Sequence, residues 1–361
     1  MKAFGFLSFG HYGHGRRADE PTAKQALRDA VDIAVGADEL GVNGAYWRVH
    51  HFAMQQASPM PLLAAAGART SRIEVGTGVI DMRYENPLHL AEEVGALDLL
   101  LDQRIAIGIS RGSPEQALRG WESFGYTGST DPRGADVARA HAAQFLDAVR
   151  GVPQAKRDTV NGTVMGGTPA DSDDLRIEPH VPDLDRRLWW GAATRETAEW
   201  TARQGLNLMS STLLTELSDS RGTSFADLQH EQIMRYRAAW REAGHSWTPR
   251  VSVSRAIFPI VSQEDERLFG RARQGSADQV GVIDGMYATF GKTYAAEPDV
   301  LIEQLKADAA VRAADTLMLT IPSQLGVDFN LHILEAFAEH VAPALGWEPS
   351  SAGPVTGYPV D

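Results

Sequence analysis

The stretch at residues 104–112 reads RIAIGISRG. Its apolar run at 105–109 is flanked by charged residues, which is typical of a short strand buried on both faces of a parallel sheet. Ser110, Arg111 and Gly112 follow at the carboxyl end of this strand, where parallel α/β folds bind their ligands. Arginine can form paired hydrogen bonds with a phosphate. The stretch therefore predicts either a phosphate contact or, as the commoner case, a strand that ends in a surface arginine.

The rest of the chain repeats this pattern of a short apolar strand followed by an amphipathic helix. We predict strands at residues 3–9, 44–49, 73–80, 105–109, 188–193, 206–211, 250–260 and 315–321. We predict helices at 23–40, 59–69, 87–101, 134–149, 196–204, 225–243 and 331–345, with interrupted helical periodicity over 264–313. Strict alternation indicates right-handed βαβ units and a parallel sheet. Eight strands favour a closed (β/α)8 TIM barrel. An open doubly wound sheet is the alternative, although no G-x-G-x-x-G motif follows the first strand.

Two longer segments interrupt the alternation. Residues 152–187 are polar and predict an insertion after strand 4, and residues 264–298 predict a second insertion after strand 7. We expect a single domain over residues 1–346. Residues 347–361 are rich in Pro, Gly and Ser without a period, so we expect them to form a flexible C-terminal tail.

Composition excludes several classes of function. The chain has 361 residues, 43% of them hydrophobic, and 34 Lys and Arg against 47 Asp and Glu give a formal net charge of −13. No basic run is present, so a nucleic-acid partner is not expected. The absence of cysteine excludes thiol catalysis and thiolate metal sites. No apolar run approaches 18 residues, so we expect no membrane partner and a soluble, cytoplasmic protein.

Four polar or glycine-containing groups fall at predicted strand ends, which a barrel collects into one mouth. They are His50 with His51, Gly78 with Val79, Ser110 with Arg111, and Thr194 with Thr197. Each has an ordinary structural explanation: the histidines are equally compatible with a polar loop, and Thr194 alone is best explained as a helix N-cap. The histidine pair lacks further ligands for a metal. Taken together, the four groups indicate a phosphate-bearing ligand across the mouth, with an imidazole beside its reactive end.

Three segments carry a family resemblance. They are WRVHHF at 47–52, RTSRIEVGTGVIDMRYENPLHLAEEVGALDLLLDQRIAIGISRG at 69–112, and LWWGAATRETAEWTARQG at 188–205. In this order and spacing they resemble the bacterial luciferase-like flavin monooxygenases, and the resemblance runs from the first strand to VAPALGW at 341–347. It implies a TIM barrel that holds FMN at its C-terminal face.

The resemblance also assigns roles to individual residues. His50 matches the catalytic imidazole, and Gly78–Val79 matches a non-prolyl cis peptide under the flavin ring. The remaining cofactor-binding positions lie around the flavin and its phosphate: Ser110, Arg111, Arg133, Ala193, Thr194 and Thr197.

The chain departs from the family pattern beside these positions. Val49 stands where a glutamate usually precedes His50, and Ala193 stands where luciferases have another glutamate. The first change removes a carboxylate that could orient His50. Trp47 and Arg48 are unusual neighbours, which suggests a substrate pocket that differs from a slot for aliphatic aldehydes.

The function implied is a two-component monooxygenase. Reduced FMN from a separate reductase would react with O2, and the resulting flavin peroxide would oxygenate a small organic substrate. A deazaflavin-dependent oxidoreductase on the same barrel and a non-catalytic flavin-binding protein are the alternatives. Helices 59–69 and 87–101 carry more apolar residues than one packed face needs, which predicts a homodimer with these helices at its interface.

Overall fold

A closed eight-stranded parallel barrel forms the centre of the protein, as a computed structural model shows. The structure describes residues 3–13, 20–112, 115–158, 173–215, 223–274, 277–283 and 286–354. In barrel order the strands are β1 (Ala3–Ser8), β2 (Gly44–Trp47), β3 (Glu74–Asp81), β4 (Ile105–Ser110), β7 (Leu188–Ala192), β8 (Asn207–Ser210), β10 (Val251–Arg255) and β15 (Thr316–Ile321), and β15 closes the ring against β1. This arrangement confirms the predicted (β/α)8 fold.

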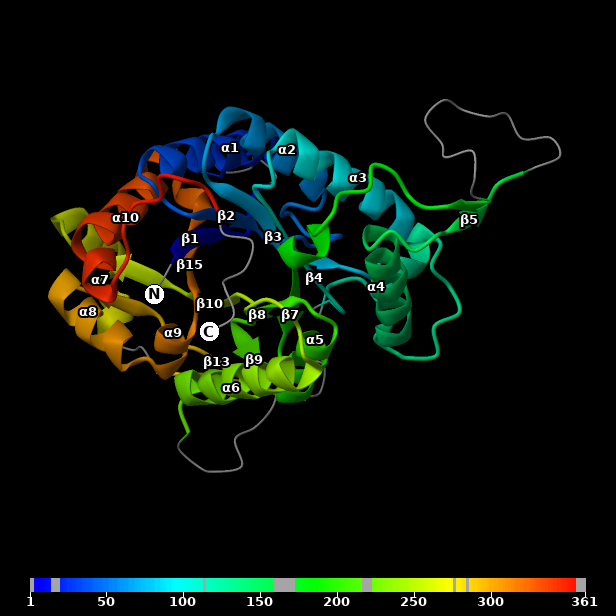
Figure 1. Cartoon of the computed structure of the whole chain (residues 1–361). Helices are drawn as coiled ribbons and strands as arrows, with labels where there is room; N and C mark the ends of the chain where they lie inside the picture. Colours follow the sequence, from blue (N-terminus) through cyan, green and yellow to red (C-terminus); the bar gives the residue numbers. More distant parts are fainter. Residues whose placement is uncertain are drawn as a thin grey trace.

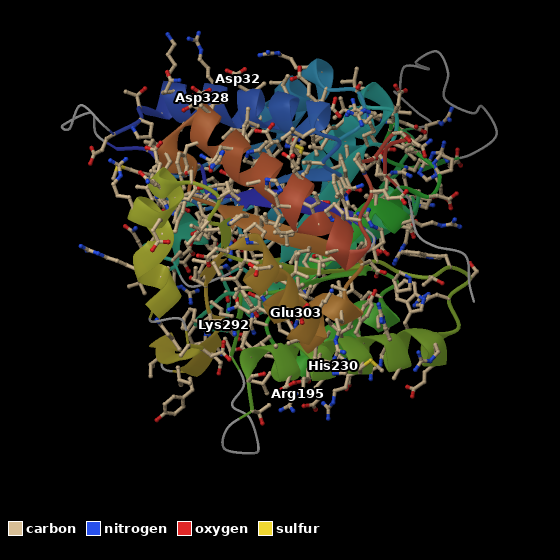
Figure 2. All side chains as sticks on the ribbon, turned by 90° about the vertical axis from the view of Figure 1, so that its left-hand side faces the viewer. Asp32, Arg195, His230, Lys292, Glu303 and Asp328 are labelled. Atoms are coloured by element: carbon tan, nitrogen blue, oxygen red, sulfur yellow. The ribbon has the colours of Figure 1, made fainter. Side chains whose placement is uncertain are left out.

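Helices surround the barrel (Figure 1). They are α1 (Ala23–Glu39), α2 (Pro59–Arg69), α3 (Pro87–Leu100), α4 (Ala135–Val149), α5 (Arg195–Arg203), α6 (Phe225–Ala243), α8 (Pro298–Ala307), α9 (Ala309–Ala313) and α10 (Val327–His340). Charged side chains of this ring, such as Asp32 on α1 and Glu303 on α8, lie on the outside of the molecule (Figure 2). Within the described residues no helix is both long and apolar enough to cross a bilayer.

Strand β4 shows how the sequence sorts side chains between the two sides of the barrel wall. Successive residues of a strand point to opposite faces. The isoleucines at 105, 107 and 109 belong to the outer core between strands and helices. Ala106 belongs to a smaller cluster inside the barrel, together with Leu7, Tyr46, Trp189, Met209 and Met318. Within β4, the large residues therefore pack toward the helices, and the small Ala106 packs among larger side chains inside the barrel.

The N-terminal end of the barrel is closed by a buried ion pair. Nη1 of Arg250 donates to Glu74 at 2.7 Å, and the Tyr46 hydroxyl donates to the same carboxylate at 2.6 Å. The guanidinium also lies 4.7 Å from the ring centre of Trp189. Buried charges are tolerated when they are paired and hydrogen-bonded, so Arg250 and Glu74 can both be buried at this end. The opposite end remains available for a ligand.

Further elements leave the barrel at two places. Between β4 and β7 lie the 3-10 turn η1 (Gly120–Phe124), α4, the short strands β5 (Ala155–Lys156) and β6 (Asp174–Leu175), and the turn η2 (Leu184–Arg187). Between β10 and α8 lie β11 (Ile257–Pro259), α7 (Gln263–Gln274), β12 (Gln279–Ile283), β13 (Met286–Phe290) and β14 (Tyr294–Ala296). Strand β13 also pairs with β9 (Leu213–Leu214), which directly follows β8.

The chain after residue 346 remains attached to the barrel for several residues. After the turns η3 (Ser323–Leu325) and η4 (Ala342–Leu345), Trp347 is buried against Phe4, and its indole nitrogen donates to Asn43 at 2.7 Å. The backbone of Ser350 donates to Gly41. The part that docks on the barrel thus extends past the expected start of the tail, whereas residues 355–361 lie outside the described part of the chain.

Candidate active site

A cavity of about 580 Å³ opens at the C-terminal ends of the barrel strands. Its volume lies within the range of roughly 300–1,000 Å³ that is usual for small-molecule sites. The structure brings all nine sequence-predicted site residues to its lining: His50, Gly78, Val79, Ser110, Arg111, Arg133, Ala193, Thr194 and Thr197.

The floor of the cavity is a bulge in β3. The pairing of β3 with β4 shifts register between Thr77 and Ile80, and the Gly78–Val79 peptide bond within the shift is cis. Val79 packs on the cluster inside the barrel. A Cβ added to Gly108 would lie 2.9 Å from Cγ1 of Val79, and one added to Gly191 would lie 3.2 Å from it. These two glycines therefore provide the space that the Val79 side chain occupies.

One side of the cavity is strongly cationic. Arg111, directly after β4, lies near Arg133 and near Arg139 on α4. Burial, followed by repulsion from these neighbours, lowers the pKa of Arg111. Among the described residues no carboxylate lies within ion-pair distance of Arg111 or Arg139. Asp131 attracts Arg111, but less strongly than Arg133 repels it. Guanidinium groups gathered in this way are suited to a phosphate.

The start of α5 adds hydroxyl groups to this side. Thr194 is the N-cap of α5, and its Oγ1 accepts a hydrogen bond from the Thr197 backbone at 3.1 Å. The same hydroxyl donates to Oγ1 of Thr197 at 2.8 Å. The N-cap explanation for Thr194 is therefore correct, and the residue also lines the cavity. A helix start with two hydroxyls beside several arginines is a favourable place for an anion.

His50 is oriented by an amide. Its Nδ1 donates to Oε1 of Gln55, and Nε2 of Gln55 donates to Nε2 of His11 at 2.8 Å. Burial lowers the pKa of His50, and the charges of Arg48 and His11 lower it further, while the bond to Gln55 acts in the opposite direction. The imidazole is therefore neutral near pH 7, with the proton on Nδ1 and Nε2 as the basic atom.

His51 has a different environment. It stacks on Tyr84 with ring centres 4.1 Å apart and meets Phe124 edge-on at 5.3 Å. Burial, with the charges of His50 and Arg83, lowers its pKa to about 4. It therefore behaves as a neutral aromatic side chain at ordinary pH.

Two acidic side chains in the cavity are already paired. Nε of Arg83 donates to Asp81 at 2.9 Å, and Glu115 lies 3.3 Å from the same guanidinium. Burial raises the pKa of both carboxyl groups, and the arginine opposes this shift. All three residues line the cavity, and the charge of Arg83 acts on both Arg111 and His51.

Sequence reasoning missed two residues that the structure adds. Gln55 hydrogen-bonds His50, but it lies five residues after His50 and in no motif. Arg139 reaches the cationic side from the first turns of α4. Its distance of six residues from Arg133 gives no signal until the loop and helix are placed in space. Among the described residues no three metal-ligating side chains gather.

Comparisons with known proteins agree with this geometry. A family model described as luciferase-like monooxygenase matches residues 3–321. The oxygenase component of a flavin-dependent trigonelline monooxygenase from Acinetobacter baylyi is 28% identical over 110 residues, 30% of this chain and 31% of the relative. An F420-dependent glucose-6-phosphate dehydrogenase from Intrasporangium calvum is 37% identical over 93 residues, 24% of this chain and 27% of the relative.

The same barrel occurs in a solved structure. The oxygenating constituent of 3,6-diketocamphane monooxygenase from Pseudomonas putida, a complex with FMN, superposes with a TM-score of 0.67 at 17% identity, over 95% of this chain and 98% of the other. The matches to three curated relatives span about half to two thirds of those relatives' own lengths, from 52% to 65%. The match of the family model over nearly the whole chain establishes that the protein belongs to the luciferase-like monooxygenase family.

Proposed function

We propose that the protein is the oxygenase component of a two-component, FMN-dependent monooxygenase. One observation carries the proposal: a cluster of arginines and a neutral, oriented imidazole lie in one cavity over the Gly78–Val79 bulge, and two of those arginines, Arg111 and Arg139, have no carboxylate within ion-pair distance among the described residues. The first suits the phosphate of FMN and the second suits proton transfer at neutral pH. The family match supports the class of reaction.

The residues present fit FMN. Arg111, Arg133 and Arg139 would hold the phosphate together with the hydroxyls of Thr194 and Thr197, with Ser110 beside them, and Ala193 leaves space at the start of the helix. The Gly78–Val79 bulge would support the flavin ring. When bound in its reduced form, FMN supplies the electrons that activate O2 for insertion into an organic substrate.

His50 would act as the proton carrier of the site. Its Nε2 is the unprotonated nitrogen, because Nδ1 donates to Gln55. Burial keeps the ring neutral, so that Nε2 can accept a proton and return it later. Gln55 holds the ring in this orientation in place of the missing glutamate.

A separate reductase would supply the reduced flavin. The relative from Acinetobacter baylyi is named as the oxygenase component of its monooxygenase, which supports this division of labour. The F420-dependent relative supports a deazaflavin as the second candidate cofactor, because it is 37% identical over its matched segment.

A homodimer completes the proposal. Leu99 and Leu100 at the end of α3 are 57% and 74% exposed, and α2 lies beside α3 (Figure 1). Two large exposed leucines at the end of one helix indicate a protein interface. We propose that α2 and α3 pack on their counterparts about a two-fold axis.

The proposal is tested by mixing the protein anaerobically with reduced FMN and, separately, with a reduced deazaflavin. Oxygen is then admitted while the absorbance spectrum is followed. We expect bound FMN to pass through a long-lived species that differs from both the reduced and the oxidised cofactor. Oxidation at the rate of free FMN, with no such species, would refute the monooxygenase. Selective binding of the deazaflavin would favour the second candidate.

A further inference from the structure

Arg48 lies in the cavity but belongs to none of the groups described so far. It directly follows β2 and stands two residues before His50, and both residues line the cavity. Nε of Arg48 donates to the Gly78 carbonyl at 3.4 Å, and the guanidinium lies 4.9 Å from the ring centre of Phe9. These two contacts place the guanidinium between the first strand and the bulge of β3.

Most of the donors of Arg48 are unused. A guanidinium carries five N–H groups, and only the one on Nε has a hydrogen-bond partner among the residues that the structure describes. No carboxylate in the described ranges lies within ion-pair distance of it. Asp81 and Glu115, which line the same cavity, are both paired with Arg83. The two terminal nitrogens of Arg48 therefore offer four N–H groups to a ligand.

This positive charge persists at neutral pH. Burial lowers the pKa of Arg48, but only to about 10. A partly buried cation without a counter-ion is unfavourable, because its lost hydration is not replaced. An anionic ligand would remove this cost, so the cavity favours such a ligand beside Arg48.

Arg48 acts on His50, whereas the strongest charges acting on Arg111 belong to other residues. Arg133, Arg139 and Arg83 each affect the pKa of Arg111, whereas Arg48 affects that of His50. The cavity thus has two positive poles. The first gathers several arginines and hydroxyls, which suits a phosphate. The second is a single planar guanidinium beside the catalytic imidazole.

We infer that the organic substrate is a carboxylate and that Arg48 binds its carboxylate group beside His50. A single guanidinium matches a singly charged, planar carboxylate in both charge and shape. The inference rests on the proposed function, because it assigns the other pole to FMN. It explains why an arginine stands in this position, and it restricts the substrate to organic acids small enough for the remaining space.

Calorimetric titration of the FMN-loaded protein tests the inference. The probes are two matched pairs, acetate with acetamide and benzoate with benzamide, which differ in charge but little in shape. In the wild-type protein we expect each acid to bind at least about tenfold more tightly than its amide, as for a hydrogen bond to a charged group. Arg48→Gln should abolish this preference. Arg48→Lys should retain part of it, because it keeps the charge without the planar fork.

Arg267→Gln is the matched control. It removes the same charge from the exposed outer face of α7, and it should leave the preference unchanged. Thermal unfolding and FMN titration of each variant show that the fold is intact.

Each of the other possible results of the titration bears on either the carboxylate inference or the proposed function. Equal binding of acid and amide by the FMN-loaded wild type, including undetectable binding of both, overturns the carboxylate inference alone. If Arg48→Gln binds reduced FMN more weakly but keeps the preference for the acid, Arg48 contacts the flavin ring, and the carboxylate inference is again overturned. Failure of the wild type to bind FMN overturns the proposed function instead.

Discussion

Replacing Arg111 by Ala should weaken the binding of FMN while leaving that of riboflavin, which lacks the phosphate, nearly unchanged. A hydrogen bond to a charged group contributes about 1.5–3 kcal/mol. Arg133 and Arg139 also approach this position and continue to attract the phosphate. We therefore expect the lower part of that range, about 1.5–2 kcal/mol, or roughly a 10–30-fold rise in Kd.

The structure also predicts the stability of the apoprotein. Arg111 has no carboxylate within ion-pair distance among the described residues, and repulsion from Arg133, Arg139 and Arg83 opposes the attraction of Asp131, so its removal leaves no broken ion pair and relieves repulsion. The midpoint of thermal unfolding should not fall. Fluorescence titration with both flavins measures the two affinities, and Arg267→Ala on the outside of α7 is the control. Equal losses for FMN and riboflavin would refute the phosphate contact.

Three further predictions concern the imidazole and the subunit contact. His50→Ala should lower turnover by about 10²–10⁴-fold with FMN binding retained, as for loss of a general acid–base, and His51→Ala should have a smaller effect on turnover; the opposite result would exchange their roles. Gln55→Glu places a carboxylate against Nδ1 of His50, which stabilises the imidazolium and raises the pKa of His50. Because the proposed base is the neutral ring, the acidic limb of the kcat/KM profile should move to higher pH. An unmoved limb would contradict the role of His50 as the base. Leu100→Glu should convert the dimer to a monomer in sedimentation, whereas Leu27→Glu, at an exposed leucine of α1, should not; a monomeric wild type would disprove the dimer.

The barrel could be predicted from the sequence because each strand and helix carries its own periodicity. The sequence shows a glycine, Gly108, within RIAIGISRG, but it does not show why a glycine is needed there. Gly108 leaves room for Val79, a residue of the neighbouring strand, and only the register of β3 against β4 reveals that contact. Local pattern therefore predicted the elements and their order, whereas the shape of the cavity floor needed the pairing between strands.

In the candidate site, too, some residues could be predicted from the sequence and others only from the structure. Residues at strand ends were predicted, because the barrel topology brings every strand end to one mouth. Gln55 and Arg139 lie in a loop and on a helix, and they reach the cavity only through the three-dimensional path of the chain. Trp347 likewise lies in a Pro- and Gly-rich segment, yet its ring packs on Phe4, a contact across almost the full length of the sequence.

The cationic side of the cavity has a kinetic consequence. The chain as a whole carries a formal charge of −13, so the arginines around Arg111 form a local attractive region on a molecule that otherwise repels anions. Such a field guides an approaching phosphate ester toward the mouth and away from the rest of the surface. In the proposed function, a reduced flavin released by a separate reductase would have limited time before dissolved oxygen oxidises it, so guided diffusion would shorten its exposure. Because salt screens this field over about 8 Å at physiological ionic strength, the association rate should fall as salt rises, while the dissociation rate changes little.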